Sequence, residues 1–265
     1  LNLSYKLINF NKIDEKNIDL LFKKNKSYFQ YKTNYLFISC GPIQTAKILI
    51  NSKPEFYDSF EFLDIQKYFT IFSKIPSYKY SLKENKITLS SIFLNLKEYT
   101  ANNEIYDNYF QVSTINNLIL SKLNLLDKQK FSLMRNFLGF FLSSQLYLWG
   151  ALDSNLSGKI IMNYKNQEFS IKKTNNNLTK ITIYKNLKKI KQILKLFNFY
   201  YLPFSIIIPE VGNGNHFGSN MPMIKNPSNN YQTDEYGRIL NHNNISIVDA
   251  SILPKISSNT ISHTL

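Results

Sequence analysis

The sequence predicts an α+β fold built on an antiparallel sheet. Short segments with strand character are mixed with helical segments, without the regular strand–helix–strand alternation that a parallel sheet needs. Two predicted strands, 159–164 and 168–172, are joined through only Lys165-Asn166-Gln167, which is a hairpin connection. The chain has 265 residues, of which 43% are hydrophobic, so it can bury a sizeable core.

The first fifty residues predict two strands and a helix. Apolar residues alternate with polar ones over 3–10, which indicates a strand, and a polar segment follows. Residues 35–38 predict a second strand. A helix is expected to begin at Pro42, because proline lacks the backbone N–H that would be unpaired there, and to end at about Asn51, before Pro54.

The rest of the chain predicts several further strands and three helices. The aromatic-rich segment 56–80 contains Pro76 and shows few clean periods, so no element is assigned to it. Helical spacing of apolar residues predicts helices over 117–126, 128–142 and 178–197. The remaining predicted strands are 87–93, 110–114, 147–151, 204–208 and 245–248.

Charge and cysteine content restrict the partners and the compartment. The formal charge of +14 comes from lysines scattered along the chain, and no nucleic-acid-binding module accompanies it, so no nucleic-acid partner is expected. The single cysteine, Cys40, rules out an internal disulfide and fits a reducing, cytoplasmic location. The most apolar stretch, 137–152, is shorter than the ~20 residues of a membrane-spanning helix, so no membrane span is expected.

A histidine in a glycine-rich turn is the first candidate for chemistry. His216 is flanked by Gly212, Gly214 and Gly218, which allow the backbone to approach a ligand closely. Imidazole titrates near neutral pH and can act as a general base. The alternative is a histidine that is merely hydrogen-bonded in a loop. The three histidines and one cysteine show no metal-ligand spacing, so no metal site is expected.

Five runs of sequence, in this order, resemble signatures of the glucose-methanol-choline (GMC) family of flavin-dependent alcohol oxidoreductases. One is near the start of the chain and four are in the last fifty residues: 36–52, 215–223, 233–238, 247–254 and 258–264. The resemblance implies a substrate-binding domain with an antiparallel sheet flanked by helices, and partial elements of an FAD-binding domain at both chain ends.

The resemblance also implies a division of the chain and a missing part. Residues 1–52 would belong to the FAD-binding domain, 53–210 to the substrate-binding domain, and 211–265 to the catalytic and flavin-contacting segment. The Gly-x-Gly-x-x-Gly turn that holds the FAD pyrophosphate in such proteins does not occur in this sequence, and the chain does not begin with Met. We therefore expect a fragment that is inactive alone and has a complementary N-terminal half as a partner.

Catalytic roles follow from the same resemblance. His216 matches the family's base. A second side chain that faces the same alcohol oxygen is expected at Asn259, with His263 as its rival. Asn259 could also be an ordinary turn residue.

Cofactor contacts are implied at both ends of the chain. Gly41 and Pro42 match the signature near the adenine end of FAD, and Asp249, Ala250 and Thr260 match positions near the flavin nucleotide. Asp249 could alternatively cap the turn that follows its strand.

The sequence thus predicts the C-terminal part of an FAD-dependent oxidoreductase acting on CH–OH groups, with a small-molecule alcohol or sugar as substrate. The flavin performs the redox chemistry, while the protein positions and polarises the alcohol. The alternative is a truncated, non-catalytic GMC remnant that acts as a sugar-binding module.

Overall fold

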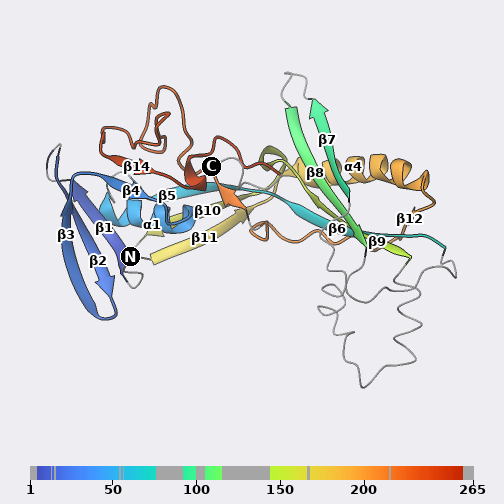
Figure 1. Cartoon of the computed structure of the whole chain (residues 1–265), viewed down its shortest axis with the longest axis horizontal. Coiled ribbons are helices and arrows are strands. Elements are labelled where there is room, and N and C mark those ends of the chain that lie inside the picture. Colours follow the sequence, from blue (N-terminus) through green and yellow to red (C-terminus); the bar gives the residue numbers. More distant parts are fainter. Residues whose placement is uncertain are drawn as a thin grey trace.

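A computed structural model defines the architecture of the chain (Figure 1). It describes residues 5–12, 14, 16–53, 55, 57–75, 92–99, 105–114, 144–165, 168–214 and 216–258. Of the strand pairs in this part of the chain, all but β4–β14 are antiparallel, and the predicted α+β class is confirmed. The three-stranded and five-stranded sheets lie at opposite ends of the molecule, with the four-stranded sheet between them (Figure 1).

The N-terminal sheet is a meander of β1 (Lys6–Lys12), β2 (Ile18–Lys24) and β3 (Ser27–Thr33). The first strand was predicted, whereas β2 and β3, which occupy the segment that follows it, were not. Ile18 and Leu20 are buried, and the aromatic and lysine residues around them leave the alternation hard to see in the sequence.

A parallel strand pair joins the two ends of the chain. The strand β4 (Leu36–Ile38) pairs with β14 (Ile245–Ile247), and α1 (Pro42–Ser52) follows β4 with Pro42 in its first turn. The predicted strand, helix start and C-terminal strand are confirmed. Buried residues of α1 pack in one core with those of β1, β4 and β14.

The central sheet has the order β11-β10-β5-β13. The predicted hairpin is confirmed, since β10 and β11 pair along their whole length. The bounds of the four strands are β5 (Ser59–Asp64), β10 (Lys159–Lys165), β11 (Glu168–Thr174) and β13 (Phe217–Gly218).

The five-stranded sheet has the order β12-β6-β9-β8-β7 and carries α4 (Asn177–Lys195) on one face. Ile183, Leu187 and Ile190 of this helix pack on Tyr68 and Phe110 of the sheet. The bounds of the strands are β6 (Lys67–Ser73), β7 (Ile92–Tyr99), β8 (Ile105–Thr114), β9 (Gln145–Ala151) and β12 (Tyr200–Tyr201).

One segment of this region had no assigned element, and one prediction is wrong. The segment 56–80, to which no element was assigned, contains β5 and β6. In β6 aromatic side chains on both faces obscure the alternation, whereas β5 alternates with Phe60 and Phe62 buried on one face. Residues 204–208 form no strand, and only Ile207 pairs, in an isolated bridge with Phe69. The predicted helices 117–126 and 128–142 lie outside the described residues, as do residues 87–91 of another predicted strand.

Two short helical turns, η1 (Ser154–Leu156) and η2 (Ala250–Ile252), complete the described elements. Neither α1 nor α4, the α-helices of the described residues, has the length and apolar character that a bilayer crossing requires.

Candidate functional site

His216 lies directly before β13 and beside the end of β5. Phe217 pairs with Asp64 and Gly218 with Leu63, so the histidine is next to Asp64 and Ile65. The side chain is half-buried and makes no hydrogen bond to another described residue. Burial lowers the pKa of His216, and the positive charge of Lys67 lowers it further. Both effects favour the neutral imidazole that a general base requires.

The Asp64 carboxylate holds the loop that leads to His216. Its Oδ2 accepts a hydrogen bond from the Gly212 backbone N–H at 2.7 Å, and its Oδ1 accepts one from Ile65 N–H at 2.9 Å. Burial raises the pKa of Asp64, while bonds from Gly212, Ile65 and Gly214 oppose the shift. A side chain at Gly214 would collide with Asp64 and with the Ile65 carbonyl, so the loop passes where only glycine fits.

The segment after His216 runs alongside η2. Ser219, Met221 and Met223 donate backbone hydrogen bonds to the carbonyls of Ala250, Ser251 and Ile252 at 2.9, 2.9 and 2.8 Å. A side chain at Gly218 would collide with the Ala250 carbonyl. Two of the runs that resemble GMC signatures, 215–223 and 247–254, are therefore in direct contact.

Asp249 links this region to the start of α1. Its Oδ2 accepts hydrogen bonds from Gly41 N–H at 2.9 Å and from Thr45 Oγ1 at 2.6 Å. Its Oδ1 accepts one from Ser251 N–H at 2.9 Å, which is the capping contact considered from the sequence. The structure thus brings together four predicted cofactor-contacting residues, Gly41, Pro42, Asp249 and Ala250. Both oxygens of the Asp249 carboxylate already accept hydrogen bonds from the protein itself.

Gly41 leaves space beside the helix start. Its φ is 80°, and a Cβ at this position would meet no atom within 4 Å. The residues present therefore fit a ligand that approaches the backbone at this point.

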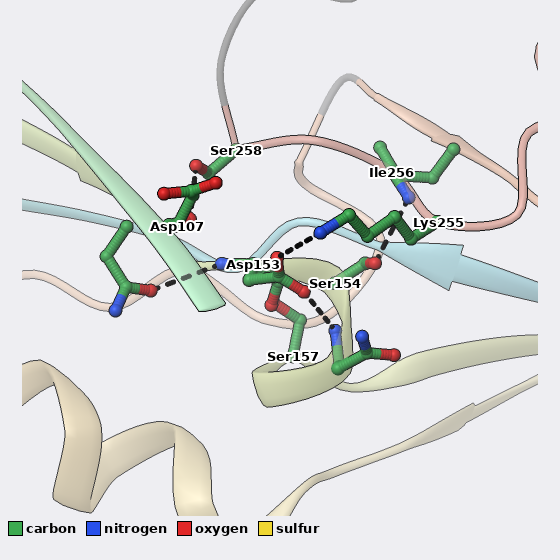
Figure 2. A network of polar contacts seen from close by, with 9 residues as sticks. Asp107, Asp153, Ser154, Ser157, Lys255, Ile256 and Ser258 are labelled. Atoms are coloured by element: carbon green, nitrogen blue, oxygen red, sulfur yellow. Dashed lines mark hydrogen bonds and ion pairs between the residues drawn. The ribbon is translucent and has the colours of Figure 1, made fainter. Parts of the chain in front are cut away.

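Asn259, His263 and Thr260, which were predicted to contact substrate or cofactor, lie outside the described residues. The segment that precedes them is anchored by polar contacts (Figure 2). Ser258 Oγ donates to the Asp107 carbonyl, and Ile256 N–H donates to Ser154 Oγ at 3.1 Å. Lys255 Nζ lies 3.8 Å from the buried Asp153 carboxylate.

Lys67, whose charge acts on His216, was not predicted from the sequence. It begins β6, is only 7% exposed, and its Nζ lies 5.4 Å from the centre of the Trp149 ring. No carboxylate of the described residues lies within 4.0 Å of this ammonium group, and burial lowers its pKa while the Asp64 charge raises it. The sequence does show a lysine within an apolar, aromatic segment. Because no strand was assigned there, the face to which the Lys67 side chain points could not be predicted.

Aromatic side chains line the sheet face that is turned away from α4. Successive strand residues point to opposite faces, and Tyr68, Phe110 and Leu148 pack on the helix. Rings on the other face contact one another, with centroid separations of 5.8 Å for Phe69–Tyr147, 6.0 Å for Tyr109–Trp149 and 5.9 Å for Phe93–Tyr109. We call these five residues and Lys67 the aromatic face.

Comparison with known proteins gives a structural match only. No protein-family model and no curated protein sequence matches the chain. The structure is similar to the crystal structure of pyridoxine 4-oxidase from Mesorbium loti, with a TM-score of 0.62 and 11% sequence identity. The match covers 97% of this chain and 54% of the other, so the chain spans about half the length of that solved structure. At this identity the likeness defines the fold.

Proposed function

We propose that this chain is the C-terminal part of an FAD-dependent oxidoreductase of the GMC type that oxidises a CH–OH group, with His216 as the base. One observation carries the proposal. The runs that resemble GMC signatures at both ends of the sequence meet through Asp249, Gly41 and Ala250, beside the loop of His216. The fold likeness to pyridoxine 4-oxidase, a GMC-family enzyme that its name describes as an oxidase, supports the same class.

The proposed division of labour leaves the redox step to the flavin. FAD, when bound, would supply the acceptor for the hydride of the carbinol carbon. His216 would take the hydroxyl proton, because removing that proton makes hydride loss easier. Asn259, or its rival His263, would donate a hydrogen bond to the same oxygen. Gly41, Pro42, Asp249, Ala250 and Thr260 remain the proposed cofactor contacts.

The exposed face of the β4–β14 pair is consistent with a sheet that a complementary polypeptide completes. Parallel sheets are usually larger and covered on both faces, whereas this sheet has two strands and α1 on one side. Phe37 is 70% exposed and Val248 is 50% exposed. We infer that residues 1–52 and 211–265 complete an FAD-binding domain with a complementary polypeptide, while 53–210 form the substrate-binding domain.

Reconstitution tests the proposal. The chain would be coexpressed with a complementary half that carries the Gly-x-Gly-x-x-Gly turn, and flavin content and anaerobic flavin reduction by alcohols would be recorded. His216→Ala should retain flavin but lose on the order of 100-fold in reduction rate. His242→Ala is the matched control, because this histidine lies beside Lys12 and Lys53 in another part of the fold. Unchanged reduction in His216→Ala would overturn the role of the imidazole.

A sugar-binding module without catalysis is the second candidate. It is favoured by the aromatic face, since Trp149 and Tyr147 are partly exposed and such rings can stack on sugar rings. Saturable monosaccharide binding by a preparation that never takes up flavin, even with a complementary half, would support this candidate over the oxidoreductase.

A further inference from the structure

We propose that the ligand of the aromatic face is an aromatic alcohol that carries an anionic substituent, and that Lys67 binds this substituent. The inference deepens the proposed function by naming a substrate class. The binding of such a molecule by this chain can nevertheless be measured without flavin or oxidation.

Lys67 is a buried residue whose ammonium group has no counter-ion within 4.0 Å among the described residues. It is 93% shielded from solvent, being 7% exposed, and no ion pair or hydrogen bond joins its ammonium group to another described residue. Burying an ammonium group costs several kcal/mol unless an anion or hydrogen-bond acceptors compensate for the lost water. An anionic ligand atom would supply that compensation.

Asp64, the nearest acid by charge interaction, already has other partners. Its two oxygens accept backbone hydrogen bonds from Gly212 and Ile65 and so hold the His216 loop. Asp64 attracts Lys67 through space but does not contact it within 4.0 Å. Among the described residues no side chain accepts a hydrogen bond from Lys67 Nζ, so an anionic ligand atom can take that place.

The surroundings of Lys67 suit a flat ring. Its Nζ lies 5.4 Å from the centre of the Trp149 ring, and the ring centroids of Trp149 and Tyr109 are 6.0 Å apart. Trp149, Phe69 and Tyr147 are partly exposed on the same face. Aromatic pairs in stacked or edge-to-face geometry contribute about 0.5–1.5 kcal/mol beyond area burial, so an aromatic ligand gains from this face more than an aliphatic one.

The position of His216 adds a geometric condition. Lys67 follows Asp64 by three residues, His216 lies beside Asp64 across the β5–β13 pair, and the charge of Lys67 acts on the His216 ring. In the proposed binding mode, one small molecule places its hydroxyl at His216 and its anionic group at Lys67. The two groups must then lie at different positions of the ring.

Trp149 provides a direct readout, because it is the only tryptophan in the chain. The intact chain would be titrated with para-(hydroxymethyl)benzoate and with its neutral methyl ester, and tryptophan emission would be recorded. The carboxylate should bind roughly tenfold or more tightly than the ester, as expected for a hydrogen bond to a charged group. Equal affinities, or no binding of the carboxylate, would overturn the proposal.

Variants locate the effect. Lys67→Met should abolish the preference for the carboxylate while leaving ester binding similar, and Lys67→Arg should keep most of it. Lys74→Met is the matched control, since Lys74 directly follows the other end of β6 and its Nζ lies 5.9 Å from the Phe199 ring centre. A preference that survives Lys67→Met would overturn the proposal. If Lys67→Met does not fold, the preference for the carboxylate over the ester is measured at low and high salt in the wild type and in Lys67→Arg. A preference that depends on charge must weaken as salt rises, and one that does not weaken in either protein would overturn the proposal.

The outcome is separable from that of the proposed function. A carboxylate preference in a chain that never supports flavin reduction would leave the Lys67 site standing and remove the oxidoreductase. Flavin reduction by neutral alcohols alone, without a carboxylate preference, would do the reverse.

Discussion

Gly41 and Asp249 are 208 residues apart in the sequence and are joined by a hydrogen bond of 2.9 Å between the glycine N–H and the carboxylate. The same oxygen accepts a bond from Thr45 inside α1. This carboxylate therefore fixes the start of α1 to the end of β14. The relative positions of the proposed cofactor-contacting residues therefore depend on these hydrogen bonds.

Asp249→Ala should destabilise the fold. It leaves the buried donors of Thr45 and Ser251 and the partly buried donor of Gly41 without their acceptor, and each loss of a buried donor's partner costs about 1–3 kcal/mol. Urea denaturation should show a decrease of about 2 kcal/mol or more in the free energy of unfolding. Glu235→Ala, at an exposed position, serves as the control and should stay within about 0.5 kcal/mol. Equal stability of the two variants would contradict the role of Asp249 in fixing α1 to the end of β14.

Gly214→Ala and Gly41→Ala should differ in their effects. At Gly214 a Cβ collides with Asp64 and the Ile65 carbonyl, so the loop of His216 must move. At Gly41 the Cβ meets open space, and only the backbone conformation (φ 80°, ψ 150°) opposes it, at a cost of about 1–3 kcal/mol. In the reconstituted enzyme, Gly214→Ala should slow flavin reduction by roughly tenfold or more. A Gly214→Ala variant that reduces flavin at the wild-type rate would show that the loop position does not matter.

Lys67→Met should raise the pKa of His216. Burial is the main cause of the lowered pKa and remains in the variant, but the repulsion between Lys67 and the imidazolium is removed. Proton NMR titration of the histidine ring resonances, assigned with His216→Ala, should show the midpoint move upwards. Lys74→Met should leave it in place. A midpoint that does not move would mean that the two groups are too far apart to interact.

Stability should fall as pH decreases below about 6.5, the ordinary pKa of histidine. Burial is the first cause of the lowered pKa of both His216 and His242, so the unfolded chain binds protons more readily than the folded chain in this range. The contribution is present above the unfolded pKa and is lost as pH falls towards the lower folded values. Thermal melts between pH 7.5 and 5 should show this loss in the wild type. The double variant His216→Gln/His242→Gln should show less of it, and an identical slope would contradict the assignment.

Local signals predicted the elements that have a clear physical marker. The start of α1 at Pro42, the hairpin of β10 and β11, and the amphipathic helix α4 all appear as expected. The strand β6 was not assigned because Phe69 and Ile71 place apolar side chains on the face opposite Tyr68 and Phe72, which obscures the period of two. The strand β5 keeps the alternation, with Phe60 and Phe62 buried on one face, but the aromatic-rich segment around it left it unassigned. β2 was missed because only Ile18 and Leu20 of its residues are buried, and β3 was missed because none of its residues is buried.

The sequence alone determined the α+β class, the order of the signature-like runs, and the candidates His216, Asp249 and Gly41. These follow from residue type, spacing and chain order, which are local properties. Only the tertiary structure decided that Asp249 is occupied by Gly41 and Thr45, that Asp64 holds the His216 loop, and that Lys67 is buried against Trp149. Such contacts join segments up to about two hundred residues apart, and their geometry depends on strand pairing that no local pattern encodes.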